Sequence, residues 1–197
     1  MTPALRSPRR LEKIRSVLAR RQPDLTVVFE NIHDAHNVSA MLRSCDAVGV
    51  LRVELIYTTE RFPAIGKKSS SSAHKWIPRR KHRSVCACYD LLSSEGFTIY
   101  ASRISHSSTP LYDLDLTGKV ALVFGNEHRG VSDEAGEKAD RNFVIPMMGM
   151  IESLNVSVAC GVTLYEALRQ RLVRGDLNHP KFSEEELREL MESWSRR

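Results

Sequence analysis

The chain has 197 residues, enough to bury one substantial core and to leave short extensions at its ends. Its net charge of +5 favours a polyanionic partner. Four cysteines without a Cys-x-x-Cys pair argue against a disulfide scaffold, and no apolar run approaches the ~20 residues that span a bilayer. These features predict a soluble, cytoplasmic protein.

Hydrophobic patterning divides the chain into alternating helices and strands. In chain order we expect a helix at 11–18, a strand at 25–29, a helix from Asn37 to Gly49, a strand at 50–57, a helix at 85–92, strands at 97–101 and 119–124, a short helix after Ser132, a strand at 142–145 and helices at 154–172 and 187–194. This alternation predicts an α/β fold with a parallel sheet of about five or six strands.

Short polar side chains stand at three of the expected helix starts. Asn37 and Ser132 can accept hydrogen bonds from the free N–H groups of the helical turn that follows each of them. Ser153 or Asn155 can do the same for the long helix near the end of the chain. That helix carries apolar residues in steps of three or four, which form one stripe: Leu154, Val158, Val162, Tyr165, Leu168 and Leu172.

Fourteen of the 29 Lys and Arg residues fall in two short segments. Residues 1–21 hold seven against a single acid, and residues 67–83 hold seven against none. Most charge runs are solvated surface. Two clusters nearly free of acids, one of them beside Trp76, instead favour contacts with RNA phosphates and a stacked base.

Several common sites are missing from the sequence. No two glycines stand two residues apart, so Gly-x-Gly-x-x-Gly is absent, as are a Walker A loop and a serine nucleophile elbow. His33 and His36 have metal-ligand spacing but no further His or thiolate nearby, so no metal site is predicted.

The stretch from Ile145 to Ala159 joins the last strand to the long helix. Pro146 lacks an N–H and ends strand pairing, and Gly149 permits a tight bend. A strand end, a loop and a helix start together offer many free backbone groups. This arrangement suits a polar, adenosine-sized ligand near the carboxyl ends of the strands, although an ordinary strand-to-helix connection has the same outline.

Three patches, in order, resemble the motifs of the SPOUT class of RNA methyltransferases, in the SpoU or TrmH family that methylates ribose 2′-hydroxyls. They are Asn-Val-Ser-Ala-Met-Leu-Arg at 37–43, Phe-Gly-Asn-Glu-His-Arg-Gly at 124–130, and the stretch at 145–159. Within the family, the spelling is most similar to the branch that methylates a tRNA guanosine, at three places: residues 21–26, 46–50 and 148–150.

The resemblance implies a fold, a cofactor and partners. It implies a parallel-sheet domain over residues 23–174 with a C-terminal trefoil knot, flanked by a basic helical extension at 1–22 and a helical extension at 175–197. It further implies S-adenosyl-L-methionine (AdoMet) as methyl donor, tRNA as substrate and a homodimer. The implied target is the D-loop guanosine at position 18, from the three places of similar spelling. The chain also lacks room for the extra N-terminal RNA-binding domain of rRNA-modifying relatives. Knots are rare, and nothing in the periodicity predicts one.

The resemblance also gives roles to individual residues. Arg43 would act with an RNA phosphate on the ribose 2′-hydroxyl, and Asn37 would hold the first motif. Glu127 would contribute from the second motif, and Ser153 and Asn155 from the third. Backbone contacts to AdoMet would come from four residues: Ser102, Gly125, Ile145 and Leu154. A guanidinium is a poor base, so Arg43 is expected to orient the ribose and stabilise a developing alkoxide with the help of a phosphate. Direct proton abstraction by Arg43 stays an open alternative.

Other interpretations remain open from the residues alone. Without the motifs, Arg43 is a surface residue on the polar side of its helix with Ser39 and Asp46, and Glu127 is a solvated loop carboxylate. The same motifs would serve an rRNA or tRNA-wobble ribose methyltransferase, or a non-catalytic RNA-binding protein on the same fold. The last helix has an apolar side, expected either at a dimer interface or on its own sheet: Leu187, Leu190, Met191 and Trp194.

Overall fold

The computed structural model describes residues 7–65 and 73–197. Its strands are β1 (Leu25–Glu30), β2 (Val53–Ile56), β3 (Arg79–His82), β4 (Thr98–Ser102), β5 (Thr109–Pro110), β6 (Val120–Phe124) and β7 (Arg141–Val144). Its α-helices are α1 (Pro8–Leu18), α2 (Ala35–Val48), α3 (Ala73–Trp76), α4 (Val85–Ser94), α5 (Asp133–Lys138), α6 (Val156–Arg174) and α7 (Glu184–Ser195). No helix in these two stretches is long and apolar enough to cross a membrane.

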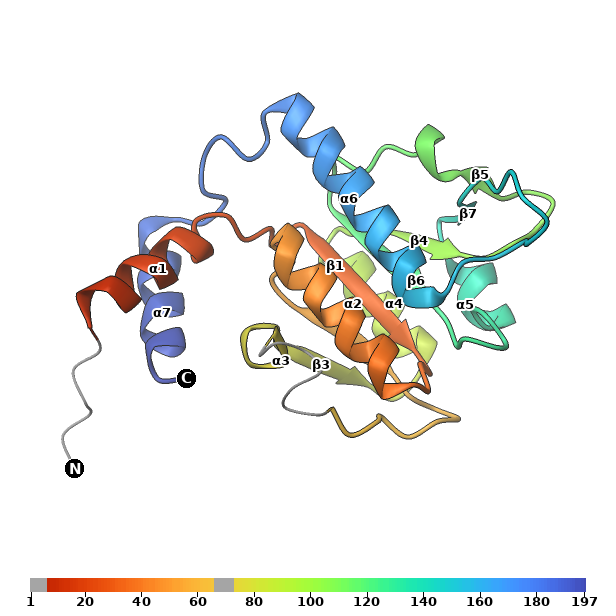
Figure 1. Cartoon of the computed structure of the whole chain (residues 1–197), viewed down its shortest axis with the longest axis horizontal. Helices are drawn as coiled ribbons and strands as arrows, with labels where there is room; N and C mark the ends of the chain where they lie inside the picture. Colours follow the sequence, from red (N-terminus) through yellow and green to blue (C-terminus); the bar gives the residue numbers. More distant parts are fainter. Residues whose placement is uncertain (1–6, 66–72) are drawn as a thin grey trace.

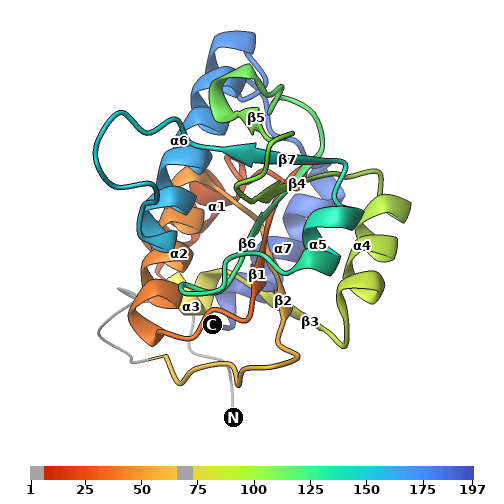
Figure 2. The same cartoon turned by 90° about the vertical axis from the view of Figure 1, so that its right-hand side faces the viewer.

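The strands form one parallel sheet in the order β3-β2-β1-β6-β4-β7-β5 (Figure 1). Helices α2 and α6 cover one face, and α4 and α5 cover the other (Figure 2). Alternate residues of β1 show why both faces are apolar: Val27 and Phe29 join the core under α2, and Val28 joins the core under α4. The expected fold class is therefore confirmed, and the carboxyl ends of the central strands share one edge.

Two strands were missed in the sequence. The side chains of β3 are Arg-Arg-Lys-His, so it has no apolar pattern, and it lies at the outer edge beside β2, where charges are tolerated. The two residues of β5 form the opposite edge and include Pro110. Parts of the two basic segments, residues 1–6 and 67–72, lie outside the described residues.

The predicted cap of α2 was wrong. The side chain of Asp34 accepts from the backbone N–H of His36, so the helix begins at Ala35. Asn37 therefore lies within the first turn, and its side chain is buried. The other predicted caps are confirmed: Ser132 caps α5 and Asn155 caps α6.

The predicted apolar stripe of α6 is divided between two sides: Val162 and Leu168 pack against the core, whereas three members lie on the outer side. Val158, Tyr165 and Leu172 are 49%, 54% and 58% exposed. The side packed against α2 and the sheet consists instead of smaller or less apolar residues: Cys160, Thr163, Leu164, Ala167 and Arg171. Tight helix packing thus overrides the simple hydrophobic count, and an apolar surface is left uncovered in the single chain.

The last helix packs on the first (Figure 1). Leu187 and Trp194 of α7 are buried against Ile14 and Leu18 of α1, forming a small separate core. Within one chain α7 therefore packs on α1 and not on the sheet. The pair of helices sits beside the carboxy-terminal end of α2.

Candidate functional site

The three motifs meet at the carboxyl edge of the sheet around the carboxylate of Glu127. Its Oε1 accepts from the side chain of Asn37 at 2.9 Å and from the backbone N–H of Asp34 at 3.0 Å. Its Oε2 accepts from the backbone N–H of His33 at 2.9 Å. The second motif is thereby tied to the loop before α2 and to the first motif.

Asn37 passes the connection on to the third motif. Its Oδ1 accepts from Nδ2 of Asn155 at 3.1 Å, while its Nδ2 donates to Glu127. The Oδ1 of Asn155 in turn accepts from the backbone N–H of Ser157, at 2.8 Å, in the first turn of α6. One row of side chains, Glu127–Asn37–Asn155, therefore joins segments 118 residues apart in sequence.

Hydrogen bonding controls the charge of Glu127. Burial raises its pKa, but the donors from Asn37, His33 and Asp34 together outweigh this effect and hold the pKa below its ordinary value. The negative charge in turn adds to burial in raising the pKa of the nearby Tyr57. Glu127 is thus a fixed carboxylate that accepts hydrogen bonds, which suits a positioning role better than proton transfer.

Asn31 and Asn126, which the sequence reading missed, shape the loops beside Glu127. The Nδ2 of Asn126 donates to the carbonyl of Asn31 at 2.9 Å, and its Oδ1 accepts from the backbone of His128 and Arg129. Asn31 has a positive φ of 52° and accepts from three successive backbone N–H groups with one oxygen: those of Thr58, Thr59 and Glu60. An Asn directly after a buried strand was the available signal.

Gly125 allows the second-motif loop to close. A Cβ at this position would lie 2.1 Å from the carbonyl oxygen of Gly130, so no side chain fits without moving the backbone. Gly130 itself has a φ of 71°, which favours glycine. The turn that carries Glu127 depends on both glycines.

Arg43 is exposed on α2, six residues after Asn37. Within residues 7–65 and 73–197 its side chain has no hydrogen bond or ion pair, which leaves the guanidinium available to a ligand. The polar side of α2 is narrower than expected: Ser39 is buried, and Asp46 is paired with Arg21. Ser153 is also exposed, in the loop before α6, and no hydrogen bond within the described residues links its side chain to the Glu127–Asn37–Asn155 row.

The residues expected to contact AdoMet lie at the ends of three adjacent strands and in the following loop. Ser102 ends β4 and is in register with Phe143 of β7, Gly125 follows β6, and Ile145 follows β7. Leu154 is half-buried, just before α6. Across residues 146–154, no backbone group bonds to another described residue. The loop therefore presents unpaired backbone groups at the strand ends, as a polar ligand requires.

Part of the second basic segment, residues 67–83, forms ion pairs within the protein. Glu54 is completely buried in β2, forms ion pairs with Arg52 and Arg80, and lies 2.6 Å from Nε2 of His82. Arg80 also pairs with Glu95 at 2.7 Å, so it is not free for RNA as its sequence context suggested. Arg79 and Lys81 remain exposed. In the described parts of the chain, no cluster of three His, Cys, Asp or Glu side chains could hold a metal ion.

The chain was compared with known proteins. Residues 24–165 match the SpoU rRNA Methylase family. Over 192 residues the chain is 43% identical to the tRNA (guanosine(18)-2′-O)-methyltransferase of Thermus thermophilus, with 98% of each chain covered. It is 41% identical to the protein of that name from Aquifex aeolicus, over 95% of this chain and 89% of the relative.

Solved structures give the same result. The crystal structure of the A. aeolicus TrmH/SpoU tRNA modifying enzyme has a TM-score of 0.90 at 40% identity, with 95% of both chains covered. The SpoU methyltransferase AviRb from Streptomyces viridochromogenes, in complex with the cofactor AdoMet, has a TM-score of 0.70 at 25% identity, covering 80% of this chain and 64% of AviRb. The chain therefore belongs to the SpoU methylase family.

Proposed function

We propose that this protein transfers a methyl group from AdoMet to the ribose 2′-oxygen of guanosine 18 in the D-loop of tRNA. The relatives named for this reaction match nearly the whole chain. The observation that carries the proposal is the hydrogen-bonded row Glu127–Asn37–Asn155, because it gathers the three motifs at one edge while Arg43 stays free. With about 1.5 Å of rise per residue, Arg43 lies roughly 9 Å along α2 from Asn37.

Bound AdoMet would supply an electrophilic methyl group on a sulfonium. The protein must align the 2′-oxygen with that methyl group and favour anionic character on the oxygen as its proton leaves. Arg43 can stabilise the developing alkoxide and bind a neighbouring phosphate, because its donors have no partner within the described chain. Asn37, Glu127 and Asn155 position the loops around it, and the exposed Ser153 would act from the third motif.

The loop after β7 fits a cofactor of this kind. Ser102, Gly125, Ile145 and Leu154 would hold AdoMet mainly through backbone groups, which selects for shape rather than charge. The apolar side chains of Met148 and Met150 are 94% and 100% exposed at the tip of this loop. Burial of such side chains against a ligand or a second chain would be favourable.

A trefoil knot is part of the proposal. The segment after β4 crosses to β5 at the far side of β7, and then returns towards β6. The returning segment is hydrogen-bonded to the end of α6. Gln170 donates to the carbonyl of Leu114 at 3.0 Å, and Arg171 donates to the carbonyl of Leu116 at 2.9 Å. The segment from β4 to β6 thus forms a loop beside the chain that runs from β7 into α6. A trefoil knot requires the second segment to pass through a loop of this kind.

We also propose a homodimer formed through the outer side of α6. Val158, Tyr165 and Leu172 give that helix an exposed apolar side next to the loop that carries Met150. Contiguous exposed apolar surface of this kind is typical of protein interfaces. The proposed domain limits are unchanged from the sequence: 23–174 for the catalytic unit, with extensions at 1–22 and 175–197. A tRNA substrate and four free cysteines fit action in the cytoplasm.

Nucleoside mass spectrometry tests the function. Purified protein, AdoMet and unmodified tRNA should yield 2′-O-methylguanosine, mapped to position 18 by nuclease fragments. An Arg43→Ala sample provides the matched control for contaminating methyltransferases. Methyl groups found only on a base, only at the wobble nucleotide, or only when rRNA replaces tRNA would contradict the proposal.

A further inference from the structure

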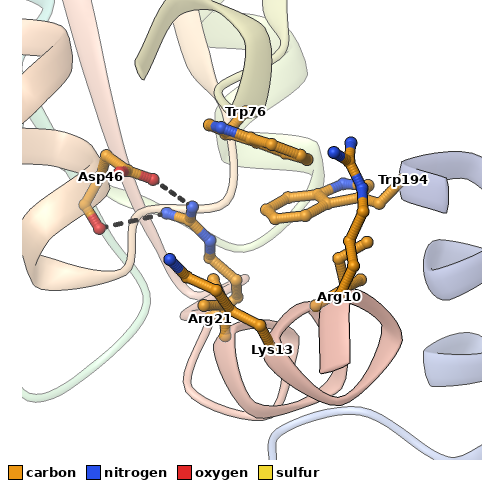
Figure 3. A pocket seen from close by; sticks show the side chains of 8 residues that line it. Arg10, Lys13, Arg21, Asp46, Trp76 and Trp194 are labelled. Carbon is orange, nitrogen blue, oxygen red and sulfur yellow. Dashed lines mark hydrogen bonds and ion pairs between the residues drawn. The ribbon is translucent and has the colours of Figure 1, made fainter. Parts of the chain in front are cut away.

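A cavity of about 320 Å³ lies between α1, α3, α7 and the carboxy-terminal end of α2 (Figure 3). It is separate from the Glu127–Asn37–Asn155 row, which lies at the other end of α2. The lining side chains come from five segments of the chain: Arg10, Lys13, Ile14, Val17, Arg21, Asp46, Trp76 and Trp194. We call it the α1–α7 cavity.

Positive charge dominates the α1–α7 cavity. Its lining holds three cations and one carboxylate, and that carboxylate, Asp46, is occupied by Arg21. Arg10 and Lys13 on α1 form no ion pair with any described residue. Figure 3 shows Lys13 reaching towards Arg21 and Arg10 rising beside Trp194. The cavity therefore has two cations without a counter-charge from the chain, which favours an anionic ligand.

Two buried N–H groups in the same lining have no acceptor. The Nε atoms of Arg10 and Arg21 are both buried without a hydrogen-bond partner. The side chain of Arg21 is only 1% exposed, and its other nitrogens are used by Asp46 and by the carbonyl of Val50 at 2.9 Å. A buried donor without an acceptor is costly, so the described chain does not fully satisfy the polar groups of this lining.

The cavity also has an aromatic wall. Trp76 and Trp194 contact each other, with ring centroids 5.0 Å apart, and Arg21 lies 5.2 Å from the ring centroid of Trp194. Trp194 is buried, whereas Trp76 is half-buried and lies across the cavity from Lys13 (Figure 3). An aromatic surface next to free cations is the combination that binds single-stranded nucleic acid, because the base stacks and the phosphate is neutralised.

We propose that the α1–α7 cavity binds one unpaired nucleotide of the tRNA substrate, with its phosphate on Arg10 and Lys13 and its base against Trp76. This inference rests on the proposed function for the identity of the RNA. Asp46 lies three residues after Arg43 on α2, a rise of about 4.5 Å. The captured nucleotide would therefore lie close in the RNA to the one whose ribose approaches Arg43, and would fix its register.

Tryptophan fluorescence gives a direct test, because the only two tryptophans in the sequence both line the cavity. Unmodified tRNA, added without AdoMet, should quench their emission, after correction against free tryptophan amide. Arg10→Gln with Lys13→Gln should remove the quenching and weaken tRNA binding about 10-fold, because the phosphate contacts are lost and the base is no longer held against Trp76. The matched control, Arg9→Gln with Arg15→Gln, removes two exposed charges from the same helix and should keep the quenching.

Three results would overturn the inference. The first is unchanged emission when filter binding shows that the tRNA is bound, and the second is equal loss of quenching in both double variants. The third is quenching by guanosine 5′-monophosphate but not by tRNA, which would assign the cavity to a free nucleotide. Trp76→Phe changes the contact with Trp194 of α7 but keeps an aromatic ring for stacking, so it should retain tRNA binding. This result would show that the charge variants weaken binding through the ligand and not through the packing of α7. Quenching by a tRNA that is never methylated would contradict the proposed function alone.

Discussion

The two ends of α2 differ in whether their polar side chains have hydrogen-bond and ion-pair partners. At the amino-terminal end, both the donor and the acceptor of the Asn37 amide are used, by Glu127 and Asn155. At the carboxy-terminal end, Asp46 is paired with Arg21, but the Nε of Arg21 has no acceptor and the charges of Arg10 and Lys13 have no partner in the described chain. A fully satisfied network holds loops in place, whereas the unpaired cations at the other end are where we propose that a ligand binds.

Arg43 lies between these two ends and is exposed. We therefore propose three tasks along a single helix: the first end assembles the motifs, the middle would contact the reacting ribose, and the last end would bind the RNA. Variants at each position should change different measurements. Separation of the subunits should have the largest effect.

A double substitution on the outer side of α6, Tyr165→Glu with Leu172→Glu, should convert the proposed dimer to a monomer and abolish methylation. Both side chains are more than half exposed in the single chain, so the fold should survive. Light scattering should fall from about twice 22.3 kDa to that mass. Quenching of the tryptophans by tRNA should persist, because the α1–α7 cavity is formed within one chain. A fully active monomer would refute the proposed interface.

Arg43→Ala should lower the single-turnover rate by about 10²–10³-fold, the usual cost of removing one donor that stabilises transition-state charge. The side chain is exposed, so the free energy of unfolding should change by less than about 0.5 kcal/mol. Arg43→Lys keeps the charge but loses the planar guanidinium, so its single-turnover rate should lie between those of the wild type and the alanine variant. A rate near that of the wild type in the alanine variant would remove Arg43 from the mechanism.

Glu127→Gln should weaken the amino-terminal end of α2. The glutamine side chain has one NH2 group in place of a carboxylate oxygen, so it cannot accept from all of the donors that Glu127 now binds. We therefore expect the free energy of unfolding to fall by about 1–3 kcal/mol. Because the folded-state pKa of Glu127 is depressed, its contribution is present above its ordinary pKa of 4.5 and is lost as pH falls through the folded value. The stability difference between the wild type and the variant should therefore shrink in denaturant titrations below about pH 4.5. A pH-independent difference would show that the charge of Glu127 does not matter.

The smallest effect is expected at the sheet edge. Arg79→Gln with Lys81→Gln should weaken tRNA binding by a few fold and reduce the salt slope by about one per lost phosphate contact. Arg80→Gln, on the same strand, is the matched control: it should lower stability instead, because Glu54 is completely buried and loses a partner. If all three substitutions act alike on the salt slope, Arg80 is available to RNA after all.

Much of the fold could be predicted from short-range patterns. Runs such as Val-Ala-Leu-Val-Phe at β6 indicate buried strands by composition alone, and the alternation with helices gives the parallel sheet. The strand conformation of β3 is imposed by β2 and by the buried carboxylate of Glu54, and neither is visible in four basic residues. The orientation of α6 was likewise set by close packing on α2.

The site was predictable only in part. Spelling identified Asn37, Glu127 and Asn155 as a group, but the hydrogen bonds that join them span 90 to 118 residues and follow from the fold. The α1–α7 cavity had no motif at all. Its lining comes from five segments of the chain. The feature that distinguishes it is that the Nε atoms of Arg10 and Arg21 lack acceptors, and no local sequence pattern reveals this.

The most direct test of the central claim uses a tRNA with 2′-deoxyguanosine at position 18 and no other change. The hydroxyl that we expect to be methylated is missing from this RNA, while the base, the phosphates and the contacts to the α1–α7 cavity remain. With wild-type protein and AdoMet, the unmodified tRNA should accept one methyl group and the deoxy-substituted tRNA none, although both should quench the tryptophans equally. Methylation of both RNAs would contradict the account.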